Sequence, residues 1–169
     1  MSAQLDHRLL LVARTRGHTP ALDRAVAAFS KTGEHAACWL ALGSAGALTD
    51  ASRRTQWLRA TGAVAASYAI NTAIKFVVRR PRPQLPGLPP LTSTVTRLSF
   101  PSAHATTSFT AVGVYGALIP AAPLYAMAAL FAVSRPYLGV HYPSDVVAGA
   151  ALGSALAIGA RRSGVTGCR

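Results

Sequence analysis

The chain has 169 residues, enough for one domain, and only 13% of them are charged, against roughly 25% in a typical soluble domain. This low charge and a mean hydropathy of +0.32 favour a helical membrane protein. Lys and Arg number 17 against 5 Asp and Glu, an excess that suits nucleic acid, an anionic membrane surface or a phosphorylated substrate. The chain carries no nucleic-acid-binding motif and is mostly apolar, which excludes nucleic acid as the expected partner.

The first half of the chain predicts one interfacial helix and two membrane spans. In residues 1–20, leucines and a valine recur at near-helical spacing between polar residues, which is typical of an amphipathic helix lying in the membrane interface. Apolar segments then predict spans over residues 22–48 and 56–78. The two cysteines, Cys38 and Cys168, have neither the spacing of a metal site nor that of a disulfide framework.

The second half begins with a loop over residues 79–100, whose five prolines exclude a helix. A third span is expected over 102–119, ending in a tight turn at "PAAP", and further spans over 124–139 and 143–160. In the last of these, Gly149 and Gly153 stand four residues apart and predict close helix packing. The expected fold is all-α, a single domain over residues 1–169 built as a bundle of about five transmembrane helices.

Five spans would bring three charged stretches to one side of the membrane. They are "KFVVRRPRP" (75–83), "SFPSAH" (99–104) and "SRPYLGVHYPSD" (134–145). Ionisable groups at membrane depth are costly and are usually functional. Because cations far outnumber carboxylates in these stretches, they predict a pocket for a multiply charged anion, of which phosphate is the obvious candidate. The positive-inside rule favours a cytoplasmic C-terminus.

The same stretches contain groups suited to phosphoryl transfer. Asp145 stands four residues after His141 and can hold one imidazole nitrogen, which leaves the other as a nucleophile. His104 comes from a different helix and can protonate a leaving oxygen. Ser102 suits the N-cap of the third span and Pro143 the first turn of the fifth, and helix N-termini bind oxyanions. No cluster of acidic residues offers a Mg²⁺ site, so neither a metal nor another cofactor is expected.

Each feature alone has a structural explanation, since a His–Asp pair often caps a helix and a basic run often flanks a membrane. Their order and spacing together resemble the type 2 phosphatidic acid phosphatase superfamily. Its signature is Lys, six residues, Arg-Pro; then Pro-Ser-Gly-His; then Ser-Arg, five residues, His, three residues, Asp. The matching positions are Lys75 with Arg82-Pro83, then Pro101-Ser102-Ala103-His104, then Ser134-Arg135 with His141 and Asp145. The single departure is Ala103, where the family usually has Gly.

The resemblance implies a membrane enzyme that hydrolyses a lipid phosphate or diphosphate without a metal. It implies that His141 is the nucleophile that forms a phosphohistidine, that Asp145 orients it and that His104 is the general acid. It assigns the phosphate oxygens to Lys75, Arg82, Ser102, the Ala103 N–H and Arg135. An auxiliary role is expected for three arginines outside the signature, Arg79, Arg80 and Arg97.

Several substrates fit this resemblance. The Ala- and Arg-rich composition and the "FSKTGEH" stretch resemble small actinobacterial members of the family, which favours decaprenylphosphoryl-5-phosphoribose in a bacterial plasma membrane. Undecaprenyl diphosphate comes next, followed by phosphatidylglycerol phosphate and phosphatidic acid. Vanadium-dependent haloperoxidases share the signature but are larger and soluble, and a non-catalytic lipid-binding protein would not need both histidines.

Overall fold

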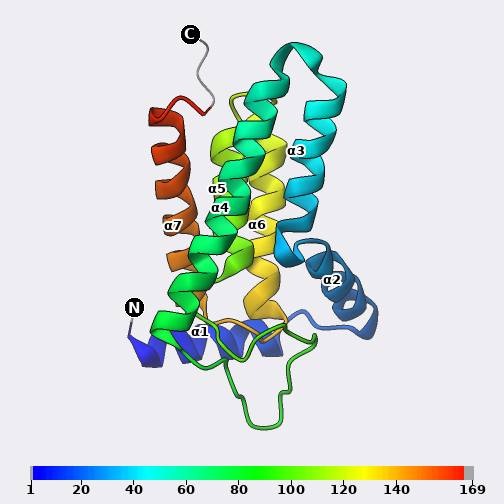
Figure 1. Cartoon of the computed structure of the whole chain (residues 1–169). Helices are drawn as coiled ribbons and strands as arrows, with labels where there is room; N and C mark the ends of the chain where they lie inside the picture. The colour runs from blue at the N-terminus through cyan, green and yellow to red at the C-terminus, as the bar shows by residue number, and fades with distance from the viewer. Residues whose placement is uncertain (1, 166–169) are drawn as a thin grey trace.

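The computed structural model describes residues 2–165, and these form helices and connecting loops without a strand, which confirms the all-α prediction. Figure 1 shows α4 to α7 and α3 side by side as an elongated bundle, with α1 lying across one end. The helices are α1 (Ala3–Thr15), α2 (Pro20–Thr32), η1 (Glu34–Ala36), α3 (Ala37–Thr49), η2 (Ala51–Arg53), α4 (Arg54–Val78), α5 (Ala103–Tyr115), α6 (Ala121–Tyr137) and α7 (Pro143–Arg162).

Helix α5 is the centre of the bundle and packs against α3, α4, α6 and α7. Its buried face carries several hydroxyl groups, whose polar atoms find partners inside the protein. Trp39 Nε1 donates to Ser108 Oγ at 2.9 Å, and Asn71 Nδ2 donates to Thr106 Oγ1 at 2.9 Å. Buried polar groups are tolerated only when they are hydrogen-bonded, so these pairs fix how α3 and α4 dock on α5.

Helices α5 and α7 pack closely because α7 presents glycines to α5, as the spacing of Gly149 and Gly153 predicts. A Cβ atom at Gly153 would lie 2.2 Å from the carbonyl oxygen of Thr106, and one at Gly149 would lie 2.6 Å from that of Ser102. Thr110 Oγ1 also donates to the Gly153 carbonyl at 3.2 Å. This contact sets the N-termini of α5 and α7 beside each other.

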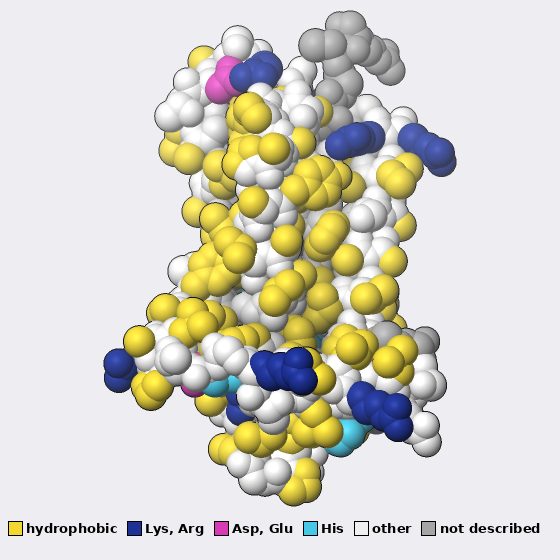
Figure 2. Space-filling model, turned by 180° about the vertical axis from the view of Figure 1, so that it is seen from behind, with side chains coloured by type: hydrophobic (Ala, Val, Ile, Leu, Met, Phe, Trp, Pro, Cys, Tyr) yellow, Lys and Arg dark blue, Asp and Glu magenta, His cyan; other side chains and the backbone are white. Residues whose placement is uncertain are grey.

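The outer surface of the bundle is apolar. Large hydrophobic side chains such as Val77, Leu48 and Val133 are 82%, 77% and 66% exposed. In Figure 2 hydrophobic side chains cover much of the middle of the molecule, while Lys and Arg gather toward its two ends. Two stretches, Ala51–Val78 and Pro143–Arg162, are both long and apolar enough to cross a bilayer.

The first predicted span, residues 22–48, is wrong as a single helix. The chain breaks between α2 and α3, where His35 and Ala36 adopt left-handed conformations with φ of 53° and 61°. Such a conformation is rare for residues other than glycine and is maintained by surrounding contacts. One of these is the burial of Ala36, which is 1% exposed. Composition alone could not reveal the break, because apolar residues continue on both sides of it.

The other predicted helices occur close to their expected positions. Residues 79–100 contain no helix, and α7 begins at Pro143, as expected. The third predicted span corresponds to α5, which ends at Tyr115, four residues before the predicted end. The fourth predicted span corresponds to α6, which begins at Ala121, three residues before the predicted start. It includes Pro123, where a tight turn was expected. Proline is tolerated there because the first turn of a helix does not need its N–H groups.

Candidate active site

The three charged stretches meet at the end of the bundle that α1 crosses. Lys75 lies in the last turn of α4, Arg135 in the last turn of α6, and the remaining groups lie at the starts of α5 and α7 or in the loops between helices. One pocket is lined by six of the eight residues predicted to be catalytic or phosphate-binding: Lys75, Arg82, Ala103, His104, Arg135 and His141. The other two, Ser102 and Asp145, are fully buried at the N-termini of α5 and α7.

The contacts of His141 define its tautomer. Arg82 Nη1 lies 3.1 Å from His141 Nε2, and because a guanidinium can only donate, Nε2 accepts and carries no proton. The proton of the neutral ring is then on Nδ1, which lies 3.5 Å from Asp145 Oδ2. The two atoms lie within ion-pair distance but do not have the geometry of a hydrogen bond, so the predicted His141–Asp145 hydrogen bond is not fully formed. Burial lowers the pKa of His141 well below its ordinary value, and Arg135 and Arg82 lower it further.

Three cations face this imidazole without a carboxylate partner among the described residues: Lys75, Arg82 and Arg135. Backbone carbonyls hold two of them in place. Lys75 Nζ donates to Pro101 O at 3.0 Å and Arg82 Nε to Thr96 O at 2.7 Å. Burial lowers the pKa of Arg82 to about 10, so it stays charged at neutral pH. Unpaired buried cations are costly, so this grouping is suited to a multiply charged anion.

Ser102 is the N-cap residue of α5, as expected, but its side chain does not cap the helix. Its hydroxyl is buried without a hydrogen-bond partner, and its N–H donates to the Asp145 carbonyl at 3.0 Å. That bond joins the starts of α5 and α7. The unpaired Ser102 hydroxyl thus lies one residue before the pocket-lining Ala103, where the N–H groups of the first turn of α5 begin.

Ser30 was not predicted to belong to the site, yet it contacts two of the predicted site residues. The Ser30 carbonyl lies 2.9 Å from His104 Nε2, and its hydroxyl accepts from Arg135 Nη1 at 2.5 Å. Because a carbonyl only accepts, His104 carries a proton on Nε2 and keeps Nδ1 for exchange. Ser30 is 1% exposed at the end of α2. Ser30 belongs to the "FSKTGEH" stretch. Apart from the family resemblance of that stretch, nothing in the sequence indicates that it lies near the site.

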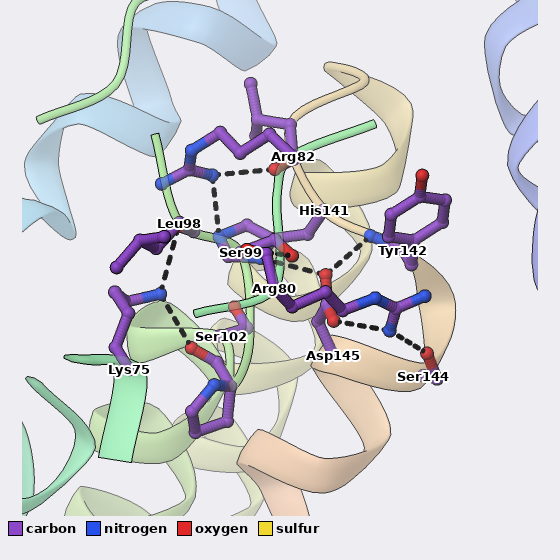
Figure 3. A network of polar contacts seen from close by, with 12 residues as sticks. Lys75, Arg80, Arg82, Leu98, Ser99, Ser102, His141, Tyr142, Ser144 and Asp145 are labelled. Carbon is purple, nitrogen blue, oxygen red and sulfur yellow. Dashed lines mark hydrogen bonds and ion pairs between the residues drawn. The ribbon is translucent and has the colours of Figure 1, made fainter. Parts of the chain in front are cut away.

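Of the three auxiliary arginines, only Arg80 joins the site. It bridges two carboxylates, with Nη1 2.8 Å from Asp145 Oδ1 and Nη2 2.8 Å from Asp6 Oδ2. Figure 3 shows Arg80 between Asp145 and Ser144, close to Tyr142. The guanidinium lies 4.1 Å from the centre of the Tyr142 ring. Arg79 and Arg97 are exposed and do not line the pocket.

Asp6 reaches this network from α1 and was also missed. Its carboxylate accepts from the Ser144 N–H at 2.9 Å and contacts the Ser144 hydroxyl. Burial acts to raise the pKa of Asp6, but hydrogen bonds from Ser144 and Arg80 lower it below its ordinary value. The N-terminal helix is thereby connected through Arg80 to the carboxylate that faces His141. No group of three His, Cys, Asp or Glu side chains within residues 2–165 is arranged to hold a metal ion.

Residues 56–166 match the PAP2 superfamily, and the chain belongs to that superfamily of phosphatases. The decaprenylphosphoryl-5-phosphoribose phosphatase of Mycolicibacterium smegmatis is 42% identical over 145 residues, which are 85% of this chain and 80% of the relative. The protein of the same name from Mycobacterium tuberculosis is 42% identical over 125 residues, 74% of this chain and 71% of the relative. The chain is accordingly a phosphoric monoester hydrolase.

Two solved structures share the fold. Aquifex aeolicus LpxE superimposes with a TM-score of 0.79 at 24% identity, covering 94% of this chain and 95% of that one. The transmembrane PAP2-type phosphatidylglycerolphosphate phosphatase of Bacillus subtilis superimposes with a TM-score of 0.79 at 21% identity, covering 98% and 87%. The bundle and the placement of its helices are therefore those of the superfamily.

Proposed function

We propose that this chain hydrolyses the 5-phosphate of decaprenylphosphoryl-5-phosphoribose and leaves decaprenylphosphoryl-ribose and inorganic phosphate. The observation that carries the proposal is the group of three cations around His141, a neutral imidazole whose unprotonated Nε2 faces the pocket and accepts a hydrogen bond from Arg82, one of those cations. The choice of substrate rests on the 42% identity with phosphatases of that name.

In the first step His104 is protonated on both ring nitrogens. His141 Nε2 attacks phosphorus, the bond from phosphorus to the ribose oxygen breaks, and His104 gives its Nδ1 proton to that oxygen while its Nε2–H stays on the Ser30 carbonyl. The Nδ1–H of His141 faces Asp145, whose negative charge stabilises the phosphorylated imidazole. Asp145 is in turn held by the Tyr142 N–H at 2.9 Å and by Arg80. Asp145 thus orients the nucleophile.

In the second step water attacks phosphorus, its proton passes to His104, and the bond from phosphorus to His141 Nε2 breaks. Inorganic phosphate leaves and both histidines regain their starting states. Lys75, Arg82 and Arg135 hold the phosphoryl oxygens through both steps, because charge builds up on these oxygens in the transition state. The Ser102 hydroxyl and the Ala103 N–H complete the phosphate site at the positive end of the α5 dipole.

We further propose that the enzyme lies in the bacterial plasma membrane with α3 to α7 as five spans. The apolar exterior of these helices and the polar pocket at one end support this arrangement. Helix α1 would lie in the interface. Asp6, Leu10 and Arg14 face the protein, while Leu5, Leu9 and Val12 are between 43% and 48% exposed on another face.

A panel of lipid phosphates tests the substrate. We expect phosphate release from decaprenylphosphoryl-5-phosphoribose to exceed that from undecaprenyl diphosphate, phosphatidylglycerol phosphate and phosphatidic acid, measured as kcat/KM on purified enzyme in detergent. A higher kcat/KM for any of the other three would reassign the substrate within the same reaction class.

The same preparation tests the proposed metal-free chemistry. Since cations and helix ends supply the positive charge, activity should survive excess EDTA, and vanadate should inhibit by occupying the phosphate site. Loss of activity in chelator that Mg²⁺ restores would contradict this mechanism. The haloperoxidase alternative requires vanadate-dependent bromide oxidation by peroxide, which we expect to be absent.

A further inference from the structure

The active-site pocket extends past the phosphate-binding groups to a second wall that the mechanism does not use. This wall is lined by Glu34 and His35 of η1 and by Tyr68 and Thr72 of α4. Glu34 is the one carboxylate among the described residues that line the pocket. We call these four residues the η1–α4 wall.

The η1–α4 wall is held firmly beside the catalytic groups. A Cβ atom at Gly33 would lie 2.8 Å from His104 Cδ2 and 2.7 Å from Phe131 Cε1, so the chain before Glu34 passes directly against the His104 ring. His35 Nδ1 lies 2.7 Å from the Tyr68 hydroxyl, which ties η1 to α4. The left-handed conformation of His35 turns the chain at this point.

The chemistry of the η1–α4 wall is that of a binding site for hydroxyl groups. A carboxylate accepts hydrogen bonds from alcohols, and the Tyr68 and Thr72 hydroxyls can accept or donate. Thr72 already donates to the Tyr68 carbonyl at 2.9 Å and keeps acceptor capacity. A carboxylate is a poor neighbour for a second phosphate, because like charges at close range repel. Cations dominate one side of the pocket, whereas a carboxylate, an imidazole and two hydroxyl groups form the other.

We infer that the η1–α4 wall binds the leaving group, that this leaving group is a sugar or another polyol, and that Glu34 selects against diphosphates. This inference rests on the proposed phosphatase function and concerns which phosphate esters that site accepts. It identifies Glu34 as a specificity residue lying outside the segment that matches the superfamily, residues 56–166.

The test compares Glu34→Gln with the unaltered enzyme on three substrates: a polyprenyl-phosphoryl pentose 5-phosphate, a polyprenyl diphosphate and a simple alkyl phosphate. The substitution keeps the size of the side chain but removes its charge. We expect kcat/KM for the pentose phosphate to fall roughly 10- to 100-fold, as for a lost charge-assisted hydrogen bond, mostly through KM. Activity on the diphosphate should rise, and the alkyl phosphate should change little.

Asp50→Asn is the matched control, because it makes the same charge change in the turn between α3 and α4, away from the pocket. It should leave the ratio between the three substrates unchanged. Tyr68→Phe should lower activity on the pentose phosphate in the same direction as Glu34→Gln. Equal changes on all three substrates in Glu34→Gln, or an unaltered enzyme that prefers the diphosphate, would overturn the inference. An unaltered enzyme that hydrolyses none of the three would instead overturn the proposed function.

Discussion

The two histidines differ in what fixes their ring nitrogens. Arg82 donates to Nε2 of His141, so that nitrogen is unprotonated, whereas the Ser30 carbonyl accepts from Nε2 of His104, so only Nδ1 of His104 can exchange a proton with the substrate. These contacts support the proposed roles of His141 as nucleophile and His104 as general acid. A simple loss of activity in either variant cannot separate the roles, but the leaving group can.

We predict different substrate dependence for His104→Ala and His141→Ala. A sugar alkoxide needs a proton as its bond to phosphorus breaks, whereas nitrophenolate leaves unaided. His104→Ala should therefore lose roughly 10²- to 10⁴-fold in kcat on the lipid substrate and much less on p-nitrophenyl phosphate. His141→Ala should be inactive on both. Equal losses for His104→Ala on the two substrates, in a protein shown to be folded, would make His104 a phosphate ligand.

Helix α1 carries charged side chains whose signs are opposite to the partial charges of the two helix ends that it contacts. Asp6 accepts from the first turn of α7, and Arg14 donates to the Tyr137 carbonyl at the end of α6 at 3.3 Å and to Pro89 O at 2.7 Å. Carboxylates are favoured at helix N-termini and cations at C-termini. Because Asp6 also binds Arg80, the docking of α1 and the position of Asp145 are connected.

We predict that Asp6→Asn lowers kcat roughly tenfold with little change in KM, as for one lost charge-assisted hydrogen bond in the positioning of Asp145. Leu10→Ala is the matched control, since Leu10 is fully buried on the same face of α1 but lies outside the network. If Leu10→Ala lowers kcat as much as Asp6→Asn does, Asp6 acts only by holding α1 in place.

The proline-rich loop reaches the active-site pocket through Thr94, Val95 and Thr96. Val95 is 67% exposed at this position, as expected of an apolar group that meets a lipid chain at the pocket entrance. We predict that Val95→Ser raises KM for lipid phosphates by up to roughly tenfold, the value of burying one such side chain, and leaves KM for short soluble phosphates unchanged. Val133→Ser, a change at an equally exposed position on α6, should leave both KM values unchanged.

The helices of the second half of the chain were predictable because prolines and charged residues punctuate them. The break at residues 33–36 was not, because it depends on left-handed conformations at His35 and Ala36 that contacts with the rest of the fold maintain. The three motif stretches could be recognised from the spacing of their residues, whereas Asp6, Ser30 and Glu34 could not. Each is an ordinary polar residue in a helical or turn sequence, and only the tertiary fold brings it to the site.

At the scale of the whole molecule, polarity is arranged as a bilayer would require. Hydroxyl groups and the cationic pocket lie inside, apolar side chains lie outside, and exposed basic residues gather at both ends. If α3 to α7 all cross the bilayer, the pocket, α1 and the proline-rich loop share one side. The turn between α3 and α4 and the end of α7 then share the other.

Single cysteines test this arrangement in a chain whose Cys38 and Cys168 have been replaced. Gln4→Cys and Ser93→Cys lie at the active-site end, and Ser52→Cys and Ser163→Cys at the far end, all at exposed positions. A membrane-impermeant maleimide applied to intact cells should label one pair and spare the other until the membrane is opened. A cytoplasmic C-terminus predicts that the active-site pair is labelled first, whereas labelling of one member from each pair would contradict five spans.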